Sequence, residues 1–229
     1  MSKKFKKFAR LGTNIIEHPK FLHNRLKKKK WIKLKNSLPR KTSEFGGLLL
    51  AKQRLKAFYG QIAERQLIIN YRYTKKLKGN RGIHFLKLLE NRLDTVLFRM
   101  RFSNTFSEIR QFITHKHILV NGKIVKTPSY LLQPGDIISV KEDSFPFIYQ
   151  SVHETFINYL NISPSNEKFR NLDEYTNQFK LLFNPDFLEI NYNTLEGIYI
   201  QHPDVSTLKY PFQIELQKIM QYYEYLRKI

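Results

Sequence analysis

Two short apolar runs joined by an Asn-Gly pair constrain the fold of this chain more than any other stretch. The runs lie in the sequence ILVNGKIV, where Asn121-Gly122 separates them. Asn and Gly tolerate the positive φ angles of the two-residue turn that fits the twist of paired strands. A third apolar run, IISV, follows the turn signal Pro134-Gly135-Asp136. The sequence therefore predicts a short antiparallel sheet in this region.

Helical patterns precede the predicted sheet. In the stretch FLKLLENRLDTVLFRM, apolar residues recur from Leu86 to Met100 at helical spacing, which predicts one amphipathic helix. Thr105 and Glu108 then form the S/T-x-x-E pattern of a capping box, in which each side chain accepts a hydrogen bond from an amide of the first turn. A second helix should begin there. Together with the sheet, these helices predict an α+β module of two helices and three strands over residues 92–141.

Positive charge is concentrated in the first third of the chain. The 229 residues contain 40 Lys and Arg against 19 Asp and Glu, and 24 of these bases but only three of the acids lie in residues 1–82. A folded protein tolerates such self-repulsion most readily when a polyanion neutralises it. The charge therefore indicates a nucleic acid as partner. Residues 1–44, which combine dense charge with few apolar residues, predict an extended basic arm.

Two further helices are predicted between this arm and the module. In LLLAKQRLKAFYG, apolar residues from Leu48 onward recur on one face, and Gly60 suits the end of the helix. A second helix should span about 61–78 and end in KKLKGNRG, whose cations favour a helix C-terminus. Residues 45–91 thus predict a helical subdomain.

Several classes of protein and site are disfavoured by what the sequence lacks. The absence of Cys removes disulfides and cysteine-ligated zinc, and the seven His are scattered. No apolar run approaches the roughly 20 residues that span a bilayer. No Gly-rich phosphate loop, Ser-His-Asp grouping or metal-ligand spacing is present. We therefore expect no cofactor, no metal and no membrane partner.

The three residues before the sheet, His115, Lys116 and His117, form a group of potential cations at the end of the second helix. The helix dipole alone favours cations there, which gives the group a structural alternative. However, further cations come from neighbouring predicted elements: Arg92, Arg110, Lys123 and Lys126. Cations that converge on a small module suit the phosphates of a folded RNA.

These residues also carry a family resemblance. Residues 92–140 resemble the RNA-binding domain of the ribosomal protein S4 family, with an R-L-D opening, an A-R-x-L-I-like helix at 109–113, and the V-N-G, P-S-Y and G-D-x-I elements. Other blocks extend the resemblance: residues 44–60 and 79–94 resemble the helical subdomain of that family, FKKFARLG its organellar N-terminus, and residues 186–204 with YPFQIEL its mitochondrial C-terminal tail. The tail, residues 184–229, is expected to contain strands and to belong with the helical subdomain.

The sequence departs from the family pattern at three places. Thr105-Phe106 stands where the family often has Ser-Arg, so one phosphate contact is missing. Lys116 replaces a frequent Gly, and a Lys in a left-handed cap costs about 1 kcal/mol. Residues 142–183 match no family pattern, and we expect them to form a surface insertion.

The resemblance implies a structural constituent of the small ribosomal subunit. Such a protein binds small-subunit ribosomal RNA early in assembly, adjoins other small-subunit proteins and lies near the side where messenger RNA enters. The alternative is an RNA-modifying enzyme of the pseudouridine synthase type, because R-L-D also surrounds the catalytic Asp of those enzymes. Asp94 lies inside a predicted helix beside Arg92 and Arg99, which favours a charge partner over a nucleophile. We therefore expect no catalysis.

The predicted RNA-binding residues are mostly the cations of the arm, the helical subdomain and the module. They are Lys3, Lys4, Lys6, Lys7, Arg10, Arg25, Lys27, Lys28, Lys29, Lys30, Lys33, Lys35, Arg40, Lys41, Lys52, Arg54, Lys56, Arg65, Arg72, Lys75, Lys76, Lys78, Arg81, Arg92, Arg110, His115, Lys116, His117, Asn121, Lys123, Lys126 and Tyr130.

Composition also bears on the compartment. The chain has 18 Phe and 13 Tyr and is rich in Ile, Asn and Lys, a bias expected of an AT-rich genome. With the mitochondrial character of the tail, this favours a mitochondrial ribosome and an organelle-encoded gene. A plastid ribosome or a bacterial cytoplasm is the alternative.

Overall fold

The structure is a computed structural model of the whole chain, and it describes residues 11, 15, 43–160, 185–205 and 207–228. The chain divides into two compact units, one formed by Met1–Phe85 with Lys209–Ile229 and the other by Leu86–Leu208. Most of the predicted arm and residues 161–184 lie outside the described residues. Within the arm, Leu11 and Ile15 are described, and both are buried.

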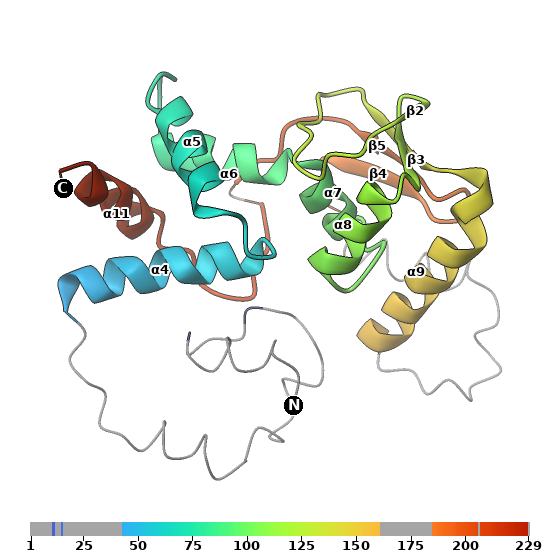
Figure 1. Cartoon of the computed structure of the whole chain (residues 1–229), viewed down its shortest axis with the longest axis horizontal. Helices are drawn as coiled ribbons and strands as arrows, with labels where there is room; N and C mark the ends of the chain where they lie inside the picture. The colour runs from blue at the N-terminus through green and yellow to red at the C-terminus, as the bar shows by residue number, and fades with distance from the viewer. Residues whose placement is uncertain (1–10, 12–14, 16–42, 161–184, 206, 229) are drawn as a thin grey trace, which may run out of the picture. The chain divides into compact units, whose positions relative to one another are not determined.

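The first unit is helical (Figure 1). Its helices are α4 (Glu44–Phe58), α5 (Glu64–Thr74), α6 (Arg81–Glu90, which continues into the second unit) and α11 (Leu216–Lys228). The helix predicted from Leu48 begins four residues earlier, because the Ser43 hydroxyl accepts a hydrogen bond from the amide of Gly46 at 3.2 Å and caps the first turn. The predicted Gly60 terminus is confirmed, with φ +63° just after the helix.

The core of the first unit forms where α11 packs on α4. Aromatic rings dominate it: Tyr71 and Tyr223 stack with centroids 5.1 Å apart, and Phe58 meets Tyr210 edge-on at 5.2 Å. Such pairs add stabilisation beyond the apolar area that they bury. Tyr223 thus joins α11 to α5, and Tyr210 joins the segment before α11 to α4, in each case across more than 150 residues of sequence.

The single helix predicted from Leu86 to Met100 is wrong, because the chain forms two helices there. α6 ends at Glu90, and α7 spans Leu93–Arg99. Between them, Arg92 is extended and bridges to Leu131, while the amide of Leu132 donates to the carbonyl of Asn91 at 2.9 Å. The loop after the hairpin therefore takes the backbone groups that a continuous helix would have used.

The helix predicted at the capping box is confirmed as α8 (Phe106–Thr114), with the Thr105 hydroxyl accepting from the amide of Glu108 at 3.3 Å. The reciprocal half of the box is absent. The amide of Thr105 donates to the hydroxyl of Ser103 at 3.1 Å instead, and the Glu108 carboxylate accepts from Ser103 and Ser151. Glu108 is thereby drawn away from the cap, to link α8 to a later helix.

The sheet of the second unit has five antiparallel strands in the order β2-β1-β3-β5-β4. They are β1 (Ile118–Val120), β2 (Lys123–Ile124), β3 (Ile137–Val140), β4 (Leu188–Asn191) and β5 (Glu196–Tyr199). The Asn-Gly hairpin is confirmed, with φ +50° at Asn121 and +74° at Gly122. The three strands of the predicted module are present, and the tail adds two more.

The tail divides between the two units. We expected all of residues 184–229 to belong with the helical subdomain. In the structure, β5 pairs with β3 through Ile137–Ile198 and Ile138–Gly197, whereas α11 packs on α4. The boundaries between the two units therefore fall after Phe85 and after Leu208, whereas the sequence predicted them near residues 91 and 184.

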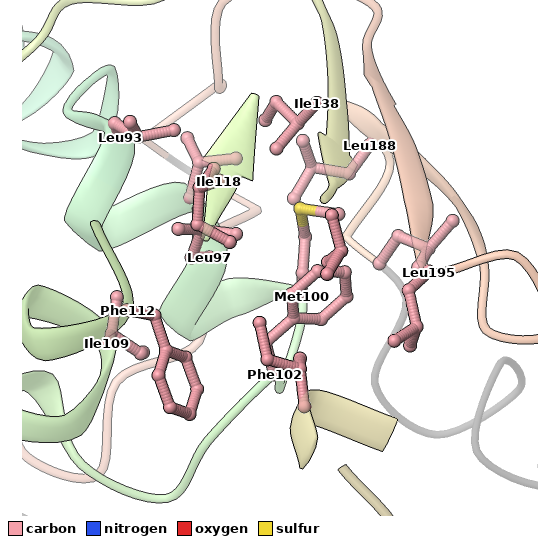
Figure 2. Close-up of a cluster of buried hydrophobic side chains, with 14 of the residues drawn as sticks. Leu93, Leu97, Met100, Phe102, Ile109, Phe112, Ile118, Ile138, Leu188 and Leu195 are labelled. Carbon is pink, nitrogen blue, oxygen red and sulfur yellow. The ribbon is translucent and has the colours of Figure 1, made fainter. Parts of the chain in front are cut away.

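One hydrophobic core fills the second unit, and its side chains converge from α7, α8 and the sheet in Figure 2. Leu97, Ile109, Ile118 and Ile138 are fully buried within it. α9 (Phe145–Leu160) follows a short 3-10 turn, Glu142–Ser144, and contributes Ile148, Val152 and Phe156 to this core. The described part of the segment expected as a surface insertion is therefore partly core.

Candidate RNA-binding surface

The end of α8 presents the predicted cations through a specific backbone turn. The amide of His117 donates to the carbonyl of Phe112 at 3.0 Å, and the amide of Lys116 donates to that of Ile113 at 3.1 Å. This pair of bonds is a Schellman motif, which requires a left-handed residue, and Lys116 accordingly has φ +67°. Both His115 and Lys116 are exposed. The motif turns the chain sharply into β1 and leaves these side chains in solvent.

Strand pairing gathers further cations beside this turn. The amide of Val125 donates to the carbonyl of Ile118 at 3.4 Å, and continuing this register places Lys126 across from His117. On the other side, the amide of Lys141 donates to the carbonyl of His117 at 2.9 Å. Three chain segments thus meet at one end of the sheet. We refer to His115, Lys116, His117, Lys126 and Lys141 as the cation cluster.

Contacts within the protein hold parts of the cation cluster in place. The rings of His115 and His117 are nearly parallel, with centroids 6.1 Å apart. His117 is half-buried, and its Nδ1 lies 2.6 Å from the hydroxyl of Ser144. Lys141 pairs with the exposed carboxylate of Asp143, and this hydrogen bond holds the pKa of Asp143 below its usual value. Lys116 and Lys126 are both exposed and therefore accessible to a polyanion.

Two predicted residues of the hairpin lie away from the cation cluster. Lys123 is exposed beside the turn, at the opposite end of β1. The Asn121 side chain donates to Asp136 at 2.8 Å and accepts from the amide of Ile137 at 2.9 Å. The Asn121 amide group therefore fastens the turn to β3.

A second charged group lies at the start of α7. The Asp94 carboxylate, 1% exposed, accepts from Arg92 Nε at 2.9 Å, Arg92 Nη2 at 3.0 Å and Arg110 Nε at 2.8 Å. Arg92 is buried, whereas the side chain of Arg110 is 27% exposed. Asp94 therefore orients Arg110 at the surface, and Arg92 serves as an internal charge partner. Tyr130 is exposed in the loop that follows the hairpin. Its carbonyl accepts from the amide of Leu93 at 2.8 Å, which ties this loop to the start of α7.

The geometry of Asp94 is that of a structural carboxylate. Both of its oxygens are occupied by guanidinium groups, and its side chain is sealed from solvent. A nucleophile needs an open approach to its substrate and an activating partner. Asp94 has no open approach, so the role predicted for it as a charge partner is confirmed, with Arg110 in place of Arg99, which pairs with Glu90.

The helical unit presents its cations mainly along α5 and the turn after it. Arg65, Arg72, Lys76, Lys78 and Arg81 are exposed, and Lys75 is half-buried over the ring of Tyr71. Glu64 is the only acid between Ala63 and Gly82. This stretch therefore forms a strongly positive surface within its unit.

Internal partners hold the other predicted cations of that unit. Lys52 is buried and donates to Glu64 at 3.1 Å and to the Tyr222 hydroxyl at 3.2 Å. Lys56 also donates to Glu64, at 3.2 Å. Burial acts to raise the pKa of Glu64, but the ammonium groups of Lys52 and Lys56 outweigh it, so this pKa lies below its usual value. Arg54 donates to the carbonyl of Leu11 at 3.1 Å.

The remaining predicted cations lie outside the described residues. They are Lys3, Lys4, Lys6, Lys7, Arg10, Arg25, Lys27, Lys28, Lys29, Lys30, Lys33, Lys35, Arg40 and Lys41. Sequence reasoning missed Lys141, because its place beside His117 depends on the pairing of β3 with β1. Across residues 43–160, 185–205 and 207–228, no group of three His, Asp or Glu is arranged to hold a metal ion. In the same residues, no helix has both the length and the apolar character needed to cross a bilayer.

Comparison with known proteins decides the family. Residues 91–138 match the S4 domain, and residues 1–90 match the ribosomal protein S4/S9 N-terminal domain. The small ribosomal subunit protein uS4 of Granulibacter bethesdensis is 34% identical over 222 residues, which cover 96% of each chain. The chain belongs to the uS4 family of small ribosomal subunit proteins.

Other uS4 relatives come from bacteria and from an organelle. The uS4 protein of Rickettsia felis is 35% identical over 185 residues, or 80% of this chain and 78% of that protein. The uS4m protein of Reclinomonas americana is 34% identical over 197 residues, or 86% of this chain and 71% of that protein. In this chain, the cation cluster lies inside the stretch that matches the S4 domain, except for Lys141, which lies three residues beyond it.

Proposed function

We propose that this chain is a non-catalytic, structural component of the small ribosomal subunit that binds ribosomal RNA chiefly through its phosphates. The observation that carries this function is the cation cluster, which gathers side chains from α8, the hairpin and the end of β3 at one exposed place. Such a group contacts phosphates and sugars and reads no sequence by itself. Recognition would come from the shape of the folded RNA.

The helical unit offers a second surface for the same RNA. The exposed cations of α5 and its following turn lie within a stretch that has a single acid. Together with the basic residues 1–44, this surface would neutralise phosphates where several RNA helices meet. Early binding in assembly, contacts with neighbouring small-subunit proteins and a place near the side where messenger RNA enters follow from membership of the family, and they are part of this proposal.

We also propose a mitochondrial ribosome as the compartment. The support is the composition typical of an AT-rich genome and the similarity to a uS4m protein. Bacterial uS4 proteins are similar to an equal degree, so a bacterial or plastid ribosome is the alternative. Cell fractionation followed by mass spectrometry of the purified ribosomes distinguishes these compartments.

Salt dependence of RNA binding tests the mechanism. The logarithm of the affinity for small-subunit ribosomal RNA should fall linearly with the logarithm of the salt concentration. The reason is that Lys and Arg side chains that neutralise phosphates release the counterions held by the RNA. In the variant Lys116→Ala/Lys126→Ala, the slope should fall by about two, at about one for each phosphate contact. The matched control Lys209→Ala/Lys218→Ala removes the same charge from the last part of the chain and should keep the slope. An equal change in both variants would mean that total charge, and not the cation cluster, determines binding.

A further inference from the structure

The sheet of the second unit has one face packed and one face open. Along β3, Ile138 and Val140 are buried, whereas Ile137 is exposed and Ser139 half-buried. The tail strands alternate in the same way. In β4 the exposed positions are Glu189 and Asn191, and in β5 they are Glu196 and Ile198. Since side chains alternate across a strand, all the exposed positions lie on a single face. We call this the outer face of the sheet.

Aliphatic side chains form the centre of the outer face. Ile137 of β3 lies directly opposite Ile198 of β5, and these side chains are 47% and 40% exposed. Leu119 of β1 lies opposite Ile124 of β2, which is 49% exposed. Directly opposite residues on one face are in contact distance, and diagonal ones are close enough for long side chains to touch. These four residues, with Ile200 beyond Ile198, make an apolar stripe.

Carboxylates flank the apolar stripe on the side of the tail strands. Glu189 of β4 lies directly opposite Ile198, and Glu196 of β5 lies opposite Asn191. Both glutamates are exposed. From Asp186 to Pro203 the chain has no Lys or Arg, although its formal net charge is +21. The outer face is therefore apolar with an acidic side along the tail strands, and it reaches Lys126 and Lys141 of the cation cluster only at one end of β1, β2 and β3.

This chemistry selects the kind of partner. Phosphates would be repelled by Glu189 and Glu196, and aliphatic side chains give bases no aromatic ring on which to stack. A second copy of this chain would bring two strongly positive molecules together and set one acidic side against another. A basic protein segment with aliphatic side chains satisfies both parts of the surface, since it can cover the stripe and pair with the carboxylates.

We propose that the outer face of the sheet docks a basic, aliphatic segment of another protein in the small ribosomal subunit. The stripe of Ile124, Leu119, Ile137, Ile198 and Ile200 packs against the aliphatic side chains of that segment, while Glu189 and Glu196 pair with its Lys or Arg. This inference rests on the proposed function, which supplies the subunit in which such neighbours occur. RNA binds through the cation cluster, whose Lys126 and Lys141 continue the same face two residues beyond Ile124 and Ser139, at the end of the sheet away from Ile137 and Ile198.

Site-specific crosslinking in the assembled subunit tests the partner. A photoreactive benzoylphenylalanine is placed at Ile198, and the crosslinked product is identified by mass spectrometry. The expected product is a peptide of another subunit protein that contains Lys or Arg with aliphatic residues. A crosslink to RNA, a crosslink to a second copy of this chain, or no crosslink overturns the inference. The same probe at Tyr130 should crosslink to ribosomal RNA, and its failure would count against the proposed function instead.

Paired substitutions separate docking from RNA binding. In subunits assembled with Ile137→Ser/Ile198→Ser, the peptide identified above should be captured at least tenfold less by a crosslinker at the neighbouring position Ile200, while affinity for ribosomal RNA stays within twofold of the wild type. The control Ile69→Ser/Ile83→Ser changes two aliphatic side chains that are similarly exposed on the helical unit, and capture should be unchanged. Because Ile137 and Ile198 point away from the core, the thermal midpoint should also be retained. Undiminished capture, or a tenfold loss of RNA affinity, overturns the inference.

Discussion

Replacing Asp94 with Asn removes the charge that joins two arginines and leaves the shape of the side chain almost unchanged. In the wild type, Asp94 accepts three hydrogen bonds from the guanidinium groups of Arg92 and Arg110. The carboxylate is 1% exposed, and the side chain of Arg92 is 7% exposed. Water cannot replace the lost carboxylate at Arg92 unless the surrounding loop moves. Asp94→Asn therefore leaves a buried positive charge without its anionic partner.

The magnitude follows from this burial. Removing one partner of a buried ion pair destabilises a protein by about 3 to 5 kcal/mol. Asn keeps one oxygen that can accept from Arg110, and that side chain is 27% exposed to water, so the lower end of the range, about 3 kcal/mol, is expected. For a chain of this length, 1 kcal/mol shifts the thermal midpoint by about 2 to 4 °C. The midpoint should fall by about 6 to 12 °C.

Thermal unfolding followed by circular dichroism measures the effect. Asp143→Asn is the matched control, because it removes the same charge from an exposed pair with Lys141 and should leave the midpoint unchanged. The double variant Arg92→Leu/Asp94→Leu should be more stable than Asp94→Asn, since it leaves no buried arginine without a partner. A midpoint for Asp94→Asn equal to that of the wild type would refute the role of Asp94 as the anion of a buried charge group.

Three further outcomes are expected. Gly122→Ala should lower the free energy of unfolding by about 1 kcal/mol in urea titrations, because φ is +74° while the added Cβ would meet no atom within 4 Å. Lys116→Gly should raise the same quantity by about 1 kcal/mol by relieving a left-handed Lys, yet weaken RNA binding; a gain in both would contradict phosphate contact by Lys116. The lowered pKa of Glu64 stabilises the fold above its unfolded-state pKa of about 4.3, and this stabilisation is lost as the pH falls through the lower folded-state pKa. Protection factors of α4 amides, which are corrected for the intrinsic pH dependence of exchange, should show that loss at decreasing pH, and Glu64→Gln should remove this contribution.

Much of the local structure was determined by the sequence itself. The Asn121-Gly122 hairpin, the Thr105 cap of α8 and the end of α4 just before Gly60 all lie where the residues predicted them. Each depends on the backbone preferences of a few consecutive residues, which act before any distant part of the chain is in place. The concentration of cations was likewise readable, because net charge needs no structure to be counted.

The tertiary structure decided which of those cations face solvent. Arg92 and Lys52 carry the same positive charge as Lys116, but both are buried and paired, Arg92 with Asp94 and Lys52 with Glu64. Lys141 joins the cation cluster only because β3 pairs with β1. Charge type is a property of the residue, whereas exposure depends on which distant segment covers it.

Long-range pairing also decided the strands and the helix break. β5 joins β3 although about 60 residues separate Ile137 from Ile198, and the outer face of the sheet exists only through that pairing. The break at Arg92 similarly needs the loop at Leu131, which takes the hydrogen bonds of an otherwise helical pattern. Local preference determined most of the individual helices and turns. How they were joined depended on distant segments, because backbone groups compete for hydrogen bonds and apolar side chains compete for burial.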